Sequence, residues 1–503
     1  MSCTDERIIK NVIDLTNKFK DDTDNKKKVE YPLDEEIVKS LKSLQTLGDD
    51  EFAIFKRVDD VKKLWKRLIE KAIICLRYYD GREPFIIGIK KKPQAYGVED
   101  LEKYFESYSS FEELLYGGSK YYRDHVIHVF RVWLLGIELL LKDSGKYLKT
   151  IRVAESSEES DHEKLSIWTI IALTHDLGYP LEKAFEIVEK TKDMMKSFVV
   201  NPIVTMDLSF SGVQNSMNDY VLRFISSKMR EIPCTGSKAK DGLQENEQKE
   251  KEIDDKKRYV ARLQPKYYYK FQKSLEQNKH GILSALIIYK LLIYFLESDY
   301  SINEDYQFEE EDVRQFNIRR EILRSIASHT CHDVYQLRAD SFSLMLILCD
   351  DAQEWGRKYL SELYVNKAEK YEYQGVQIDL SEEIIDCSIT DSYVVESDLS
   401  LKGILSRFEK QSKTYRDIFR DGQDTKNRNF NFARKWSIDV IDASSTNKYA
   451  IELLVSTEKQ TSITVRRVHG EKIENEERFY KEFRNIFKSA KVNSTKEMIT
   501  VEL

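Results

Sequence analysis

The sequence predicts a mainly helical protein that ends in a smaller α+β domain. Glycine and proline are scarce, with 18 and 7 among 503 residues, which is typical of helical architectures. Apolar residues recur at helical spacing over much of residues 121–371, without the strand–helix alternation of a parallel-sheet enzyme. After residue 376 the pattern changes to short apolar runs that are typical of strands.

The first 116 residues are predicted to form a polar, mainly helical region. Helical patterning is weak around residues 7–19 and 33–46. It is stronger in VKKLWKRLIEKAIICLRYY, residues 61–79, and the segment FIIGI that follows is a candidate short strand.

Residues 117–375 are predicted to form the central domain. The expected helices span 121–141, 164–176, 181–197, 212–230, 279–298, 311–329 and 340–371. Residues 234–257 are almost devoid of apolar side chains, so we expect a solvated, mobile insertion there.

Residues 376–503 are predicted to form a smaller α+β domain that serves regulation or oligomerisation, because they lack candidate catalytic residues. The expected strands are VQIDLSEEIIDCSITDSYVVE, KWSIDVIDAS, KYAIELLVS and TSITVRRV. Helices are expected near 399–421 and 476–489, and the boundary with the central domain near residue 375.

Composition excludes several classes of protein. The formal net charge of −7 disfavours a scaffold that binds nucleic acid mainly through its phosphates. The six cysteines are scattered without a C-x-x-C pair, as expected in a reducing cytoplasm. The N-terminus lacks the continuous apolar core of a signal peptide, and the longest apolar stretch, at 283–296, is too short to span a membrane. We therefore expect a soluble cytoplasmic protein with no membrane partner.

The segment IIALTHDLGYP, residues 170–180, carries the strongest functional signal. Its apolar helical run ends in the adjacent pair His175 and Asp176, and the spacing of the preceding residues places His175 on a core face. Burying an imidazole beside a carboxylate is costly unless a partner compensates, and a metal ion commonly does so. The pair is therefore a candidate for two metal ligands of an enzyme.

Other histidines and one aspartate stand in similar surroundings. His125 and His128 are three residues apart in a strong helical pattern, so they face roughly the same way. Asp350 follows the apolar run LMLIL, His280 opens an apolar helix, and His329 lies in SHTCHD. A lone buried histidine is more often a hydrogen-bonded core residue, but the combination on apolar helices predicts a joint metal site.

The order His128, then His175-Asp176, then Asp350 resembles the H…HD…D pattern of the HD-domain superfamily of metal-dependent phosphohydrolases, over roughly residues 120–360. The resemblance implies an HD-domain helical bundle in which these four residues hold a divalent ion that activates water against a phosphate ester. Imidazole and carboxylate ligands suit Mn, Mg, Co, Ni, Fe or Zn. One such ion is expected.

The first histidine of the pattern has two candidates. His128, followed by Val129 and Val132, fits the family's first motif better than His125 does, so we take His128 as the ligand. His125 is then expected to assist catalysis by supporting a ligand or contacting phosphate, with Arg123 as a neighbouring anion contact.

The segment HGILSA, which begins at His280, resembles the H-[EG]-x-x-S-[AG] element of HD proteins. In the deoxynucleoside triphosphate triphosphohydrolases, a histidine at this place assists at the α-phosphate and is not a metal ligand. In two-metal members, which include the HD-GYP cyclic-dinucleotide phosphodiesterases, the histidine ligates a second metal, and His329 would complete that second site. The sequence leaves both roles open.

Three further residues are candidate phosphate contacts. HDLGYP resembles the start of the HD-GYP signature, but the later elements of that signature are absent. Tyr179 stands near the position where triphosphohydrolases often carry another histidine. Lys266 and Lys270 lie in the tyrosine-rich stretch 259–273, which is suited either to base stacking or simply to packing. No phosphate loop or serine nucleophile elbow is present.

The resemblance implies an enzyme that hydrolyses deoxynucleoside triphosphates to deoxynucleoside and triphosphate. It also implies a homo-oligomer that responds to a nucleotide effector, and some relatives of this kind act in antiviral defence. One alternative is a dinuclear-metal phosphodiesterase or phosphatase that acts on cyclic mono- or dinucleotides or nucleoside monophosphates. The other is a non-catalytic nucleotide sensor.

Overall fold

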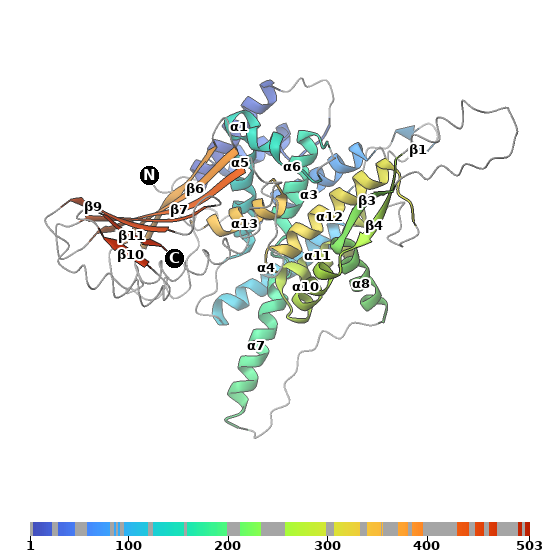
Figure 1. Ribbon diagram of the computed structural model, residues 1–503. Helices are drawn as coiled ribbons and strands as arrows, with labels where there is room; N and C mark the ends of the chain where they lie inside the picture. Colours follow the sequence, from blue (N-terminus) through green and yellow to red (C-terminus); the bar gives the residue numbers. More distant parts are fainter. Residues whose placement is uncertain are drawn as a thin grey trace, which may run out of the picture.

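The structure is a computed structural model of the chain (Figure 1). The residues it describes are 4–22, 29–45, 58–80, 85–86, 89–90, 95–118, 124–154, 158–198, 212–232, 257–297, 306–331, 340–353, 355, 371–380, 385–395, 430–441, 448–456, 462–469, 491–494 and 498–502.

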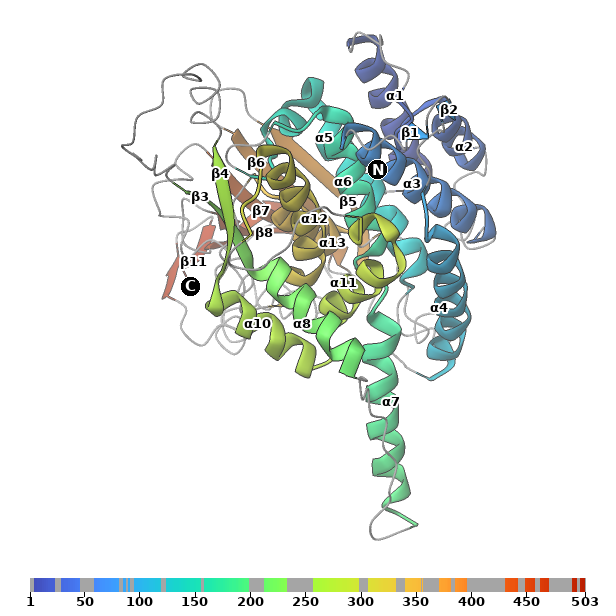
Figure 2. The ribbon, with the colours of Figure 1, turned by 90° about the vertical axis from the view of Figure 1, so that its right-hand side faces the viewer.

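The described part of the chain is mainly helical with a smaller share of strands, as predicted (Figures 1 and 2). Its first elements are α1 (Asp5–Asp22), α2 (Glu35–Gln45), α3 (Val58–Tyr79), a short hairpin of β1 (Phe85–Ile86) and β2 (Ile89–Lys90), and α4 (Val98–Gly118). These elements precede the helices that carry the candidate site.

The candidate site is built on a central group of helices. They are α5 (Val126–Thr150), α6 (Asp161–Thr174), α7 (Tyr179–Met195), α8 (Gly212–Ser226), α10 (Pro265–Glu276), α11 (His280–Leu291), α12 (Glu310–Ser328) and α13 (Phe342–Ala352). A 3₁₀ turn, η2 (Ile293–Phe295), follows α11.

Three of the predicted helices differ from the structure. The helix expected over 279–298 ends at Leu291, because the backbone is extended at Leu292 before the 3₁₀ turn η2. The helix expected over 212–230 ends at Ser226, because Ser227–Ile232 forms β3 and pairs antiparallel with β4 (Arg258–Leu263). This long-range pairing overrides the local helical spacing. The helix expected over 340–371 is observed only over Phe342–Ala352, since the backbone turns extended at Gln353. The charged segment 234–257 lies between β3 and β4 and, apart from Lys257, outside the described residues.

The strands predicted after residue 376 lie in one seven-stranded sheet, whose two most C-terminal strands were not predicted. Its strands are β5 (Tyr371–Leu380), β6 (Ile385–Val395), β7 (Phe430–Ile441), β8 (Lys448–Ser456), β9 (Ser462–His469), β10 (Lys491–Ser494) and β11 (Met498–Glu502). The spatial order is β10-β11-β9-β8-β7-β6-β5, and every neighbouring pair is antiparallel except β6 with β7. The boundary predicted near residue 375 falls inside β5, and the helices predicted near 399–421 and 476–489 lie outside the described residues.

The sheet lies beside the helical part of the chain. Its β5–β7 end is next to α5 and α13 in both ribbon views (Figures 1 and 2). Trp436 on β7 is only 1% exposed and belongs to the same hydrophobic core as the helices. Burial of this indole therefore joins the strands to the helical core.

Helices α5 and α6 form the centre of that core because they are apolar on almost every side. A capping box of Ser160 and Glu163 begins α6. The indole nitrogen of Trp133 on α5 donates to Thr169 Oγ1 (3.0 Å), and that of Trp168 on α6 donates to the Trp133 carbonyl (3.1 Å). These buried hydrogen bonds fix how the two helices that carry His128 and His175 face each other.

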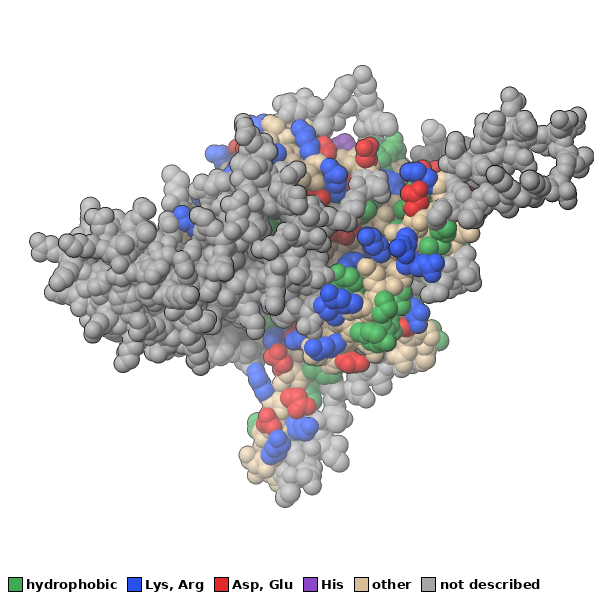
Figure 3. Space-filling view, in the orientation of Figure 1, with side chains coloured by type: hydrophobic (Ala, Val, Ile, Leu, Met, Phe, Trp, Pro, Cys, Tyr) green, Lys and Arg blue, Asp and Glu red, His purple; other side chains and the backbone are tan. Residues whose placement is uncertain are grey.

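Helix α7 stands apart from this core. Only its first part lies against α11, and the rest extends away from the body (Figures 1 and 2). Lysines alternate with acidic side chains along it (Figure 3), and two pairs at (i, i+3) spacing, Lys183–Glu186 and Asp193–Lys196, support the exposed turns. Within the described residues, no helix is both long enough and apolar enough to cross a membrane.

A test of the α5–α6 contact uses Gly136. A Cβ atom at this position would lie 2.1 Å from the Trp168 indole, which is buried and has no room to shift. We expect Gly136→Ala to lower the free energy of unfolding by about 1–3 kcal/mol through overpacking. Urea denaturation measures the change. The control is Gly212→Ala at the start of α8, where a Cβ would meet nothing within 4 Å, and an equal loss in both variants would contradict the packing described.

Candidate metal centre

The candidate site lies where the ends of several helices meet. His128 lies in the first turn of α5, and His280 is the first residue of α11. His175 and His329 immediately follow the last residues of α6 and α12, and Asp350 is in the last turn of α13. The carbonyl ends of three helices therefore face the site, and their partial negative charge favours a cation.

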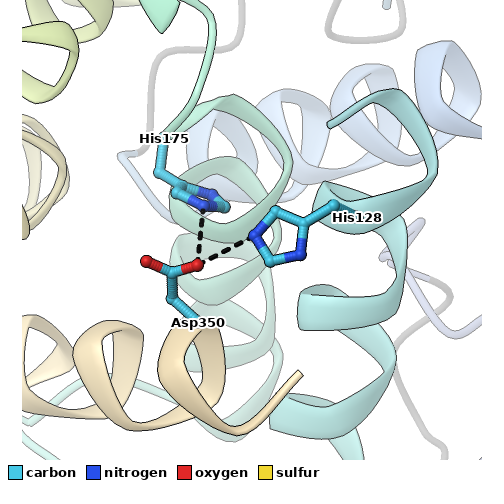
Figure 4. A group of neighbouring side chains, drawn as sticks. All are labelled: His128, His175 and Asp350. Carbon is cyan, nitrogen blue, oxygen red and sulfur yellow. Dashed lines mark hydrogen bonds and ion pairs between the residues drawn. The ribbon is translucent and has the colours of Figure 1, made fainter. Parts of the chain in front are cut away.

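The structure brings His128, His175 and Asp350 together (Figure 4). His128 Nε2 is 2.8 Å from Asp350 Oδ1, and His175 Nε2 is 3.8 Å from the same oxygen. Asp176 Oδ2 lies 3.8 Å from His128 Nε2 and 3.5 Å from His175 Nε2. Ligands at about 2.0–2.2 Å from a shared ion lie roughly 3.0–3.5 Å apart when adjacent. The observed distances scatter around this range: His128, His175 and Asp350 form one group with metal-ligand spacing, and Asp176 lies beside both histidines.

The outer nitrogen of each buried histidine is already engaged. Nδ1 of His175 lies 2.8 Å from the Ala172 carbonyl, and Nδ1 of His329 lies 2.6 Å from the Ile326 carbonyl. A carbonyl only accepts, so each Nδ1 carries a proton and each Nε2 faces the site, where it becomes a metal ligand once it holds no proton of its own. Both Nε2 atoms are buried and make no hydrogen bond within the described part of the chain. Buried orphan nitrogens of this kind fit metal ligation.

Asp176 connects two sides of the site. Its Oδ2 faces His128 and His175, whereas its Oδ1 lies 3.3 Å from His280 Nε2 and 3.6 Å from His329 Nε2. His175, Asp176 and His329 form a second group with metal-ligand spacing, which overlaps the first at His175. Because one ring nitrogen binds only one ion, these groups describe either one enlarged centre or two adjacent sites.

The carboxylates of the site strongly favour a positive charge beside them. Burial opposes ionisation of Asp176 and Asp350, but the adjacent histidines outweigh it and hold the pKa of each carboxyl well below its usual range. Burial also disfavours charge on His175, yet Asp176 and Asp350 raise its pKa to about 9. Burial lowers the pKa of His329, so this ring stays neutral. A divalent cation bound here would displace the proton that His175 otherwise holds beside the two carboxylates.

His280 has a carboxylate partner on α7. Its Nδ1 lies 2.6 Å from Glu182 Oε2, and its backbone N–H donates to the same oxygen at 2.8 Å. Burial raises the pKa of Glu182, but the bonds from His280 outweigh it and lower the pKa to about 2. The carboxylate is therefore charged at neutral pH, holds the Nδ1 proton, and leaves His280 Nε2 directed at Asp176.

The connection between the His-Asp pair and α11 is very close. Gly178 N–H donates to Ser284 Oγ (2.7 Å), and a Cβ on Gly178 would lie 2.4 Å from the His280 carbonyl oxygen. Glycine is thus required for the chain to pass this point, and Ser284 of the HGILSA segment anchors it.

His125 and Tyr179 form one wall beside the ligands. Their rings stack with centroids 3.8 Å apart, and the Tyr179 ring is 5.3 Å from that of His280. His125 Nδ1 lies 3.6 Å from Glu112, and its ring centroid is 6.0 Å from that of His128. The structure thus places His128, and not His125, among the metal-ligating groups, with His125 as a neighbour.

The other predicted contacts are less well placed. Arg123 lies outside the described residues. Lys266 is exposed on α10, and the carbonyl of Lys270 accepts a hydrogen bond from Cys331 Sγ (3.7 Å), two residues after His329. Both lysines remain candidates for phosphate contact.

Sequence reasoning missed Glu182 and Gln353. In the sequence, Glu182 has the pattern of an ordinary acidic residue in the first turn of a helix. Gln353 has that of a polar residue that follows the end of an apolar helix. Gln353 is three residues after Asp350, a spacing that places both on one face, and this was the available signal. Lys183 was also missed, with its ammonium 5.2 Å from the Tyr179 ring centre.

Comparisons with known proteins give no relative: the chain matches no family model, no curated protein and no solved structure.

The metal centre is tested by binding. We expect saturating Mn²⁺ to stabilise the metal-stripped protein, by about 2.7 kcal/mol at a concentration of one hundred times the Kd. His175→Ala and Asp350→Asn each remove a buried ligand and should abolish this gain. Thermal unfolding with and without Mn²⁺ measures it. His162→Ala is the control, because His162 lies on α6 and packs against Tyr31. Undiminished Mn²⁺ stabilisation of both ligand variants would rule out the centre described.

Proposed function

We propose that the protein is an HD-type, metal-dependent phosphohydrolase that acts on nucleotides, with deoxynucleoside triphosphates as the favoured substrates. The observation that carries the proposal is the convergence of His128, the His175–Asp176 pair and Asp350 from three parts of the sequence, with their donor atoms 2.8–3.8 Å apart. These are the four residues that the HD resemblance names. The preference for deoxynucleoside triphosphates rests on His280, which opens the HGILSA segment and belongs to neither group with metal-ligand spacing among the described residues.

The ligand group would bind the ion through two imidazoles and the carboxylates. When bound, a divalent ion acts as a Lewis acid that polarises a phosphate ester and lowers the pKa of water toward neutrality. The Nδ1 contacts of His175 and His329 orient the rings before any ion arrives. Such preorganisation reduces the reorganisation needed at the moment of reaction.

His280 is the proposed general acid/base. Its side chain is 18% exposed, more than those of His128, His175 and His329, so a substrate can reach it. Glu182 holds its Nδ1 proton, which leaves Nε2 free to exchange a proton with a leaving group or water. Its distance of 3.3 Å from Asp176 places that exchange next to the ligands.

The residues around this histidine suit an anionic substrate. Lys279 Nζ lies 3.5 Å from Glu182 Oε1, and Lys183 lies over the Tyr179 ring. These cations are available to phosphate oxygens, while the stacked His125–Tyr179 pair offers an aromatic wall. We propose His125 and Tyr179 as substrate contacts on that basis.

The deciding experiment is a screen of nucleotides against metals. The purified protein is incubated with each of the four deoxynucleoside triphosphates and Mn²⁺, Mg²⁺ or Co²⁺, with and without other nucleotides as effectors. Triphosphate, phosphate and nucleoside are measured separately. We expect triphosphate and deoxynucleoside in equal amounts. Absence of any hydrolysis across the whole set, with metal bound, would support the non-catalytic sensor instead.

A dinuclear phosphodiesterase is the second candidate, and His329 favours it. The His329 Nε2 atom is buried, makes no hydrogen bond within the described residues and points toward Asp176 Oδ1 at 3.6 Å. With Asp176 as a bridging carboxylate, His329 and His280 would hold a second ion. Two tightly bound ions per chain, together with hydrolysis of cyclic nucleotides or nucleoside monophosphates, would favour this function over the first.

The role of His280 is tested through its partner. We expect Glu182→Gln to lower kcat by about 10–100-fold, because a neutral amide holds the Nδ1 proton of His280 less firmly than the carboxylate does. The Kd for Mn²⁺ should stay within about twofold of that of the unmodified protein, because Glu182 bonds to His280 and not to the four proposed ligands. Glu186→Gln, one turn further along α7 and paired with Lys183, is the control. Equal kcat values in both variants would contradict the proposed role.

A further inference from the structure

Gln353 supports His128 from the side opposite the metal ligands. Its side chain is fully buried and has two partners: Oε1 lies 2.5 Å from His128 Nδ1, and Nε2 donates to the Trp355 carbonyl at 2.7 Å. Because a carbonyl only accepts, the amide must turn its NH₂ end to Trp355 and its oxygen to His128. The oxygen then accepts the Nδ1 proton, so Nε2 is the His128 atom that faces the site, 2.8 Å from Asp350 Oδ1.

Asp5, the first residue of α1, holds the two sides of this arrangement together. Its Oδ1 accepts hydrogen bonds from Arg131 Nε (2.8 Å) and Trp355 Nε1 (2.9 Å), and its Oδ2 accepts one from Arg131 Nη2 (2.7 Å). Arg131 is fully buried and lies three residues after His128 on α5. A two-point contact between guanidinium and carboxylate is strong and directional.

These contacts form a closed ring. It runs from His128 to Gln353, through the hydrogen bond from the Gln353 amide to the Trp355 carbonyl, from the Trp355 indole to Asp5, on to Arg131 and back along α5. The ring fixes the start of α5 against the end of α13, and those two helix ends carry His128 and Asp350, whose donor atoms are 2.8 Å apart. A buried polar network is strong only when every member is satisfied, so loss of one member disturbs the others.

We propose that Gln353 is a positioning residue of the metal centre and that Asp5 carries its effect to the N-terminal helix, so that metal affinity depends on the docking of α1. This inference rests on the metal centre in the proposed function but on no particular substrate. It assigns the first helix of the chain a part in a site that lies more than one hundred residues further along the sequence.

The first test compares glutamine variants of the full-length, metal-stripped protein. Mn²⁺ affinity is measured by the electron paramagnetic resonance signal of free Mn²⁺. We expect Gln353→Met to bind Mn²⁺ about 10–100-fold more weakly, as is typical when a partner of a ligating histidine is removed. Gln353→Glu still accepts the Nδ1 proton but loses the donor to the Trp355 carbonyl, so its affinity should fall between those of Gln353→Met and the unmodified protein. Gln315→Met, at a buried glutamine of α12, is the matched control and should bind normally.

The second test addresses α1. Asp5→Asn keeps the shape of the side chain but loses its charge, and we expect about tenfold weaker Mn²⁺ binding. Asp14→Asn, at an exposed aspartate on the same helix, removes the same charge and should leave affinity unchanged. Thermal unfolding of each metal-free variant shows whether it is folded, and only folded variants are compared.

The outcomes separate this inference from the proposed function. Normal Mn²⁺ binding by Gln353→Met, or equally weak binding by Gln353→Glu, would overturn the positioning role. Normal binding by Asp5→Asn would overturn the link to α1. An unmodified protein that binds Mn²⁺ but hydrolyses no nucleotide would overturn the phosphohydrolase proposal and leave the positioning result intact. If the unmodified protein binds no Mn²⁺, both proposals fail.

Discussion

The candidate site depends on hydrogen bonds between histidine Nδ1 atoms and free carbonyls at helix ends. His175 and His329 each follow a helix and each bond to the carbonyl three residues earlier. The last carbonyls of a helix have no partner within it, so the ring N–H satisfies a group that would otherwise need water. The same bond sets the tautomer and aims Nε2 at Asp176. The hydrogen bond that ends each helix therefore also orients the histidine ring toward the site.

The sequence allowed the helical class, most helix positions and the C-terminal strands to be predicted, because apolar spacing reports which face is buried. It also indicated His128, His175, Asp176 and Asp350, since ionisable residues at the end of apolar runs need compensation. It did not reveal β3, whose partner β4 comes after a long charged segment. Nor did it reveal Glu182 or Gln353, whose roles come from which helix ends meet in space.

The carboxylates of the site are kept ionised by different partners. Asp176 and Asp350 stay ionised through the surrounding histidines, whereas Glu182 stays ionised through His280, with a smaller contribution from Lys279. One carboxylate, Asp176, faces both groups with different oxygens. Binding of a cation and movement of a proton therefore share a single side chain, and neither is electrostatically independent of the other.

The close passage of Gly178 against α11 has a mechanical consequence. The turn after Asp176 and the start of α11 touch without space for a methyl group, so Asp176 and His280 move as one rigid unit. The start of α7 is bonded to this unit through Glu182, so any adjustment to substrates of different size must come from the side chains of the His125–Tyr179 wall or from the later turns of α7. Substrate selectivity would accordingly evolve through changes in that wall, while the spacing between Asp176, at the cation, and His280, which exchanges the proton, stays constant.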